Sequence, residues 1–479
     1  MLFNSLLYPV FLAVTVAVAW ALLRMRSLRM AFLLVASYLF YMSWNPQFIL
    51  LIVGSTLLDF FVGRAIEDTP PERARRRKSL LLVSLAGNLG VLGVFKYTNF
   101  FLQSFVDIGR LFDVDVPIPI LAITLPVGIS FYTFQTMSYT IDVYRGVLKA
   151  ERNFGRFAVF VAFFPQLVAG PIVRATDLLP QLGRAPRLDR DQVGEALFRI
   201  ARGLTKKVII ADFLALNLVD RAFSQPSLYS GAELMVALYA YTFQIYCDFS
   251  GYSDIAIGSA RLLGYTLPEN FVRPYVATSV AEFWRRWHLT LSQWLRYYVF
   301  FPLGGSRGGP WMAHRNTMIT LILIGLWHGA AWKFVVYGAL HGVAVSINRV
   351  LVRRKRLTEP GYYDRRQPFA QVLWKWMLTF HFVVLARILF RAPSFSAAAE
   401  IWNGLWTQGW GLGRITVSIW LVLGLAFVSH LTPSRWMARA SVEFSRWPAV
   451  GQGAALAALA AVFATFAETD VVPFIYFQF

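Results

Sequence analysis

Residues Met318–Trp332 read MITLILIGLWHGAAW, and His328 is the only ionisable side chain among them. A run this apolar belongs in a membrane or in a protein core. An imidazole at bilayer depth loses its hydration unless a partner, water or a substrate meets it, so it is a functional candidate by default. The pKa of histidine lies near neutrality, which suits proton transfer to or from a hydroxyl. Helix packing is the alternative role for His328.

Outward from this stretch, apolar runs recur along the whole chain at lengths of close to 20 residues, as helices that cross a bilayer require. Of the 479 residues, 57% are hydrophobic and 15% are charged, whereas soluble chains average about 25% charged residues. We therefore expect an all-α polytopic membrane protein with one domain over residues 1–479. It should contain about 11–14 membrane segments, re-entrant ones included.

The net charge of +20 comes from Lys and Arg that gather in short segments between apolar runs. This pattern is typical of cytoplasmic loops and not of a face that binds nucleic acid, so no nucleic acid is expected as a partner. The segments Arg24–Arg29, Thr69–Ser79 and Arg349–Arg366 are predicted to be cytoplasmic, as is the approach to the last span at 435–446. Counting crossings places both termini outside a bacterial inner membrane.

Several other kinds of site are excluded by motif. The single Cys247 rules out an intrachain disulfide and a cysteine-based zinc site. The glycine-rich run at 303–309 is not followed by GK[ST], and the chain has no GxSxG or HExxH motif. We expect no metal, no bound cofactor and no cleavable signal peptide.

Residues 269–309 differ in amino-acid composition from the apolar runs. Pro274, Pro302 and a glycine-rich turn interrupt a segment that contains FWRRWH at 283–288. The segment is too polar for a simple span and too aromatic for a solvent loop, so we predict an interfacial or re-entrant arrangement. Within it, His288 beside Arg285 and Arg286 could orient an anionic donor such as a phosphopantetheine or nucleotide phosphate. Helix packing or lipid headgroup contact are the alternatives.

The remaining ionisable residues in apolar surroundings favour structural roles. His341 follows His328 by 13 positions on what is predicted to be one continuous helix, on which the two rings would be about 20 Å apart on different faces. Asp248 and Asp254 are expected to pair with Arg or to cap broken helices. Three further histidines carry no companion pattern and are expected to pack: His314, His381 and His430.

Seven strings spread over nearly the whole chain, in the expected order, resemble the membrane-bound O-acyltransferases, and within them the bacterial alginate O-acetyltransferase branch. They are KYTNFF (96–101), ISFYTFQ (129–135), PQLVAGPI (165–172), DFSGYSD (248–254), PENF (268–271), EFWRRWHLTLS (282–292) and LWHG (326–329). One departure is Tyr297, where close relatives often have Asp. It puts in doubt any donor contact that this acid would make.

The resemblance implies a multi-helix fold around a transmembrane tunnel, with His328 as the catalytic histidine at its centre. The family's second functional histidine, nearer the cytoplasmic face, falls on His288. A thioester donor, either acetyl-CoA or an acyl-carrier thioester, would enter from the cytoplasm, and a hydroxyl acceptor from the other side. Arg285, Arg286 and Trp327 are expected to bind substrate.

The C-terminal segment 470–479 ends in FIYFQF and is predicted to be extracytoplasmic. One interpretation is an aromatic terminus in the headgroup belt. The segment also resembles the C-terminal motif of the small membrane peptide of teichoic-acid D-alanylation, which implies that Tyr476 is an acyl relay.

The function expected from these features is transfer of an acyl group, with acetyl favoured, for O-acetylation of an extracytoplasmic polysaccharide such as alginate. The implied partners are membrane lipids, an extracytoplasmic SGNH-type acetyltransferase, the polysaccharide as indirect acceptor, and a carrier protein as a further option. D-alanyl or other acyl transfer to an envelope polymer is an alternative. A proton-coupled transporter or flippase, which would form no covalent acyl intermediate, is a second alternative.

Overall fold

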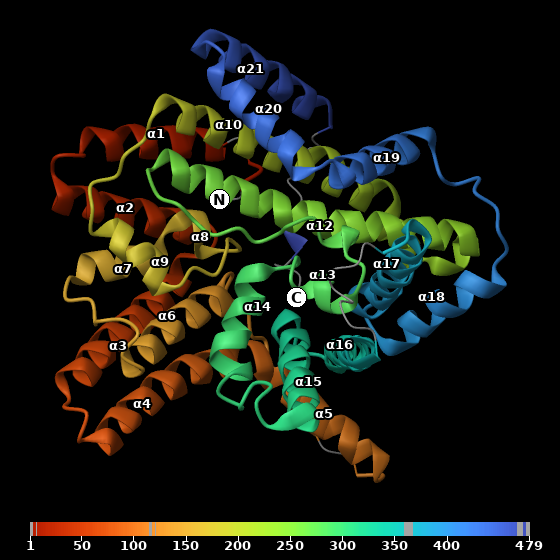
Figure 1. Ribbon diagram of the computed structural model, residues 1–479, viewed down its shortest axis with the longest axis horizontal. Coiled ribbons are helices and arrows are strands. Elements are labelled where there is room, and N and C mark those ends of the chain that lie inside the picture. Colours follow the sequence, from red (N-terminus) through yellow and green to blue (C-terminus); the bar gives the residue numbers. More distant parts are fainter. Residues whose placement is uncertain are drawn as a thin grey trace. The chain divides into compact units, whose positions relative to one another are not determined.

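The computed structural model describes residues 3–5, 7–114, 117–119, 121–358, 367–466 and 473–475. Within these ranges every regular element is a helix (Figure 1), so the all-α prediction is confirmed. Contacts divide the chain into two compact units. The first consists of Met1–Ala196 with Ile255–Pro268, and the second of Leu197–Asp254 with Glu269–Phe479.

The first unit is built mainly from the N-terminal helices. These are α1 (Leu7–Ala21), α2 (Arg26–Met42), α3 (Ile49–Asp68), α4 (Ala74–Leu92), α5 (Thr98–Leu111), α6 (Ile129–Tyr144), α7 (Phe154–Ala162), α8 (Phe164–Leu167) and α9 (Ala175–Leu182). Two helices contribute to both units, namely α10 (Arg190–Leu204) and α12 (Gly231–Leu262).

The second unit contains the remaining helices. These are α11 (Asp220–Ser224), α13 (Val280–Trp284), α14 (Leu289–Leu295), α15 (Gly309–His328), α16 (Trp332–Thr358), α17 (Phe369–Arg391), α18 (Phe395–Thr407), α19 (Val417–Leu431), α20 (Ser434–Arg446) and α21 (Ala449–Phe466). A π-helical segment, Thr205–Asp212, follows α10 directly.

Four helical segments of the described chain are long and apolar enough to cross a membrane: Pro46–Asp68, Ala74–Leu111, Trp332–Lys355 and Phe369–Arg391. A fifth span arises if the bent pair α19 and α20 counts as one. Large apolar side chains on these helices are exposed, among them Leu50, Phe61 and Phe369, as lipid contact requires. A larger number of membrane segments must include helices that are short, broken or charged, such as α12.

Helices α3, α4 and α6 pack against one another in the first unit (Figure 1) around a buried carboxylate. Asp59 is fully buried and accepts hydrogen bonds from the hydroxyls of Ser84 and Thr140 and from the amide of Asn88. A polar side chain at this depth is costly unless it is satisfied, and here α4 and α6 supply the donors to the carboxylate on α3. The network therefore joins these helices.

The prediction of one continuous helix from His328 to His341 is wrong. α15 ends at His328, Gly329 is extended, and α16 starts at Trp332. The two helices then pack against each other side by side (Figure 1). Gly325 lies against the carbonyl of Phe334, and Gly338 against the carbonyl of Leu321, so the helices run antiparallel. Apart from Lys333 the sequence between the two histidines carries no charge, and the small residues after His328 mark the turn.

Candidate functional site

His328 is the last residue of α15 and is 2% exposed. Its ring centroid lies 5.2 Å from that of Phe390 on α17 and 5.1 Å from that of Trp327. The turn at Gly329 follows at once, so the imidazole stands where the helix ends, among aromatic rings. This placement gives a proton-accepting group in an environment from which bulk water is excluded.

His288 lies at the start of α14 in the left-handed conformation, with a φ of 43°, and its side chain is fully buried. Its Nδ1 lies 3.0 Å from Oδ1 of Asn270, and the same oxygen accepts from the hydroxyl of Thr290 at 3.0 Å. An amide oxygen is only an acceptor, so Nδ1 of His288 carries the proton and Nε2 the lone pair. Burial lowers the pKa of His288 to about 3. The imidazole is therefore neutral.

Trp327 lies against both histidines. Its ring centroid is 5.4 Å from that of His288 and 5.1 Å from that of His328. The structure thus brings three of the predicted site residues, from α14 and α15, into one buried aromatic cluster. The ring of Phe249 from α12 also meets the imidazole of His288 edge to face, with the ring centroids 4.6 Å apart.

The two predicted arginines lie in more accessible surroundings than the buried cluster. Arg285 is exposed, and Arg286 forms an ion pair with Glu282 at 2.7 Å. Burial opposes ionisation of Glu282, but hydrogen bonds from Thr278 and Arg286 outweigh it and hold the pKa of that carboxyl below its usual range. A buried neutral imidazole is a poor ligand for phosphate, so the structure disfavours the predicted anion-binding role of His288.

Sequence reasoning missed Arg387, which is buried within α17. Its guanidinium lies 4.6 Å from the ring centroid of Trp287 and 5.4 Å from that of Phe390. A cation held between aromatic faces is stabilised by their quadrupoles. Through Phe390 it adjoins His328. The available signal was a charged residue within a run as apolar as 372–390.

The histidines expected to be structural are held by packing and hydrogen bonds. Nδ1 of His341 accepts from the indole of Trp284 at 3.2 Å. His430 accepts from the backbone N–H of Tyr275 at 3.1 Å, and His381 lies 2.8 Å from the hydroxyl of Tyr239. Each of these three side chains thus has a partner within the fold.

Tyr476 lies outside the described residues, but the two residues before it are placed. Phe474 and Ile475 are 2% and 4% exposed. The ring of Phe474 lies 5.4 Å from that of Phe249, which itself contacts His288. The described end of the tail is therefore separated from His288 by one aromatic ring.

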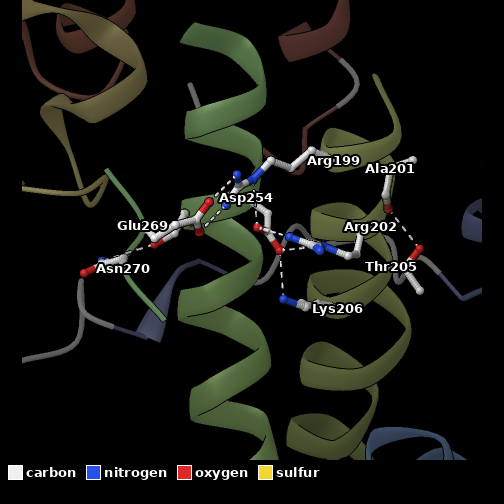
Figure 2. A network of polar contacts seen from close by, with 9 residues as sticks. Arg199, Ala201, Arg202, Thr205, Lys206, Asp254, Glu269 and Asn270 are labelled. Carbon is white, nitrogen blue, oxygen red and sulfur yellow. Dashed lines mark hydrogen bonds and ion pairs between the residues drawn. The ribbon is translucent and has the colours of Figure 1, made fainter. Parts of the chain in front are cut away.

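Asp254 on α12 forms ion pairs with three cations, as Figure 2 shows. Arg199, Arg202 and Lys206 reach its carboxylate at 3.1, 2.6 and 2.8 Å. The predicted pairing of Asp254 with Arg is confirmed. Arg199 also binds Glu269 at 2.6 Å, and Glu269 directly precedes Asn270. This network therefore holds the backbone that presents the acceptor for His288.

No group of three or more His, Cys, Asp or Glu side chains that could hold a metal ion occurs among the residues that the structure describes.

Residues 149–390 match MBOAT, the membrane-bound O-acyltransferase family. The chain is 41% identical over 384 residues to the probable alginate O-acetylase AlgI of Pseudomonas putida, an alignment that covers 80% of this chain and 76% of that protein. The chain belongs to the membrane-bound O-acyltransferase family. It is therefore a multi-pass membrane enzyme that transfers an acyl group to oxygen.

Relatives within this family differ in their named acceptors. The chain is 35% identical over 402 residues to the peptidoglycan O-acetyltransferase of Helicobacter pylori, covering 78% of this chain and 73% of that protein. It is 31% identical over 284 residues to the teichoic acid D-alanyltransferase of Streptococcus thermophilus, covering 55% and 67%. The part of this O-acyltransferase that matches the family includes His288, Trp327, His328 and Arg387, and the tail lies beyond it.

Proposed function

We propose that this O-acyltransferase moves an acetyl group from a cytoplasmic thioester, through a tunnel across the bacterial inner membrane, for O-acetylation of an extracytoplasmic polysaccharide such as alginate. The observation that carries the proposal is that two buried histidines, His288 and His328, both contact the indole ring of Trp327. The relatives of the chain include a probable alginate O-acetylase and a peptidoglycan O-acetyltransferase. Acetyl-CoA or an acyl-carrier thioester would be the donor, with exposed Arg285 and the partly buried Arg286 meeting its anionic part.

His328 would act as general base. It takes the proton of the acceptor hydroxyl while that oxygen attacks the thioester carbonyl, the carbon–sulfur bond breaks, and the leaving thiolate receives the proton. His288, neutral and with its Nδ1 proton bound by Asn270, can accept a hydrogen bond through Nε2. Its task is to orient the substrate beside Trp327.

Tyr476 would be the first acceptor. Its phenol loses a proton to His328 and forms a phenyl acetate, which keeps the acyl group activated for a second transfer. A separate extracytoplasmic acetyltransferase of the SGNH type would then take the acetyl group to the polysaccharide. The burial of Phe474 and Ile475, with Phe474 separated from His288 by the ring of Phe249, supports this role.

The test uses purified full-length protein in vesicles with a labelled acetyl thioester on the cytoplasmic side. His328→Ala should lower label transfer by a factor of roughly 10²–10⁴, the usual contribution of a general base. His381→Ala is the matched control and should transfer normally. Unchanged transfer by His328→Ala would remove the catalytic assignment.

Mass spectrometry of the C-terminal peptide tests the relay. Without the partner enzyme, acetyl-tyrosine should accumulate at Tyr476, and Tyr476→Phe should bind donor but export no label. A D-alanyl thioester offered in parallel tests the alternative that the teichoic acid relatives suggest. Export with no label ever bound to the protein would favour a transporter.

A further inference from the structure

A buried ionic triad holds the described end of the tail. Lys207, in the π-helical segment after α10, binds Asp248 on α12 at 2.6 Å and Asp212 at 2.8 Å. The other carboxylate oxygen of Asp248 accepts the backbone N–H of Ile475 at 2.8 Å. Lys207 also lies 3.5 Å from the carbonyl oxygen of Pro473. Both members of the Lys207–Asp248 pair thus bind tail backbone.

The seat around this pair is apolar. Phe474, the residue between the two anchored backbone groups, lies 5.4 Å from the ring of Phe249 and 5.0 Å from that of Tyr252. Gly251 permits the close approach of the two supporting segments, since a Cβ there would lie 2.7 Å from the carbonyl oxygen of Gly203. The ion pair and the ring pocket are therefore parts of one surface.

The anchoring of the tail is energetically linked to the triad. Lys207 and Asp248 are buried, and a buried carboxylate is costly unless both oxygens are satisfied. Asp248 uses Oδ1 for Lys207 and Oδ2 for the tail. Release of the tail would leave Oδ2 without its charge-assisted hydrogen bond, so the docked state is favoured.

We infer that Lys207 and Asp248 form a latch that docks the C-terminal segment on α12 and so delivers the residue after Ile475 to the active site. This inference rests on the proposed relay role of Tyr476. The two residues touch no reacting atom and are positioning residues. Phe249, which contacts both Phe474 and His288, joins the latch to the histidine cluster.

The triad offers a matched pair of variants. Asp248→Ala and Asp212→Ala each leave Lys207 with one carboxylate, but only Asp248→Ala removes the acceptor for Ile475. Purified full-length protein is digested with a carboxypeptidase, and the new C-terminus is read by mass spectrometry. Wild type and Asp212→Ala should resist cleavage at Ile475 and Phe474. Asp248→Ala should lose these residues roughly tenfold or more faster, the range for a lost hydrogen bond to a charged group.

Asp248→Asn restores an acceptor oxygen and should recover part of the protection. Wild-type resistance in Asp248→Ala would overturn the latch, as would equal exposure in Asp212→Ala. The digestion needs no turnover, so it separates the two proposals. If Asp248→Ala exposes the tail while Tyr476→Phe still exports acetyl groups, the relay fails and the latch stands. If the tail stays protected in Asp248→Ala and Tyr476→Phe exports no acetyl groups, the latch fails and the relay stands.

Discussion

His288 owes its protonation state to burial and to its position beside Asn270 and the rings of Phe249 and Trp327. The amide oxygen binds the proton on Nδ1, and burial keeps the second nitrogen unprotonated at neutral pH. The contact with Asn270 and the burial of the ring thus determine which tautomer and protonation state of His288 faces a substrate. Asn270 is the side chain through which that form can be changed with least loss of shape.

Asn270→Asp should raise the pKa of His288 from about 3, because a carboxylate at 3.0 Å favours the imidazolium. A reaction that needs the neutral ring then fails as the pH falls through the raised pKa, so the acid limb of kcat moves to higher pH. Thr290→Val removes another donor to the same oxygen without adding charge and should keep the wild-type profile. An unshifted acid limb in Asn270→Asp would contradict this account of His288.

The same lowered pKa predicts how stability depends on pH. The unfolded chain binds a proton at His288 near pH 6.5, whereas the folded protein does not until about pH 3. The contribution of neutral His288 to the free energy of unfolding is therefore fully present above pH 6.5. Below that pH it falls by about 1.4 kcal/mol per pH unit. The thermal unfolding midpoint of His288→Gln should fall less between pH 7.5 and 5 than that of wild type. Parallel curves for the two proteins would refute a buried neutral His288.

From the sequence, single ionisable residues in apolar runs could be recognised as site candidates, but the residues that contact them could not. His328 stands alone in an apolar run, and Arg387 is a charged residue in the apolar run at 372–390, which also holds Lys375 and His381. Asn270 and Phe249 gave no such signal, because their contacts with His288 join segments that are 18 to 39 positions apart. Only the fold brings them together.

At the scale of elements, the α15–α16 hairpin is the feature that the sequence hid. Apolar residues continue through Gly329, and no Pro marks the turn; Lys333 is the one charge close to it. In the sequence, Gly325 and Gly338 are indistinguishable from small residues of a single span. In the structure they lie where the two antiparallel helices are in close contact. Such small residues allow close packing of membrane helices. The hairpin places His328 at a helix end.

Gly325→Ala should destabilise the protein and impair catalysis, because the new Cβ would overlap the carbonyl of Phe334, which is backbone and cannot rotate away. Overpacking of this kind costs typically 1–3 kcal/mol. Gly90→Ala on α4 meets nothing within 4 Å and is the control, expected to be neutral or stabilising. The unfolding midpoint and kcat of both variants decide. A fully stable, active Gly325→Ala would mean that the helices do not pack as described.

At the scale of the whole molecule, composition alone was enough for an all-α membrane protein, since few charges and recurrent apolar runs leave no other fold class. The division into two units was out of reach. Two helices, α10 and α12, contribute to both, and the histidine cluster draws on α12, α14, α15, α17 and the tail. Such long-range assembly leaves no local periodicity to detect.

Sidedness is the prediction that belongs to the whole chain, because donor entry and acetyl export both depend on it. The loop before α3 should be outside and the loop after it inside, since Arg73, Arg75, Arg76, Arg77 and Lys78 follow α3. The native Cys247 is buried, so it should not react with a membrane-impermeant maleimide. Gln47→Cys and Glu72→Cys place one exposed thiol on each side of this span.

In intact cells the maleimide should label Gln47→Cys at once and Glu72→Cys only after the membrane is permeabilised. The parent protein, with Cys247 alone, measures background labelling in both conditions. The reverse pattern would place both termini in the cytoplasm by the same count of crossings. Tyr476 would then face the donor side, and no extracytoplasmic partner could take an acetyl group from it. The relay therefore depends on the orientation of α3, although the two lie at opposite ends of the chain.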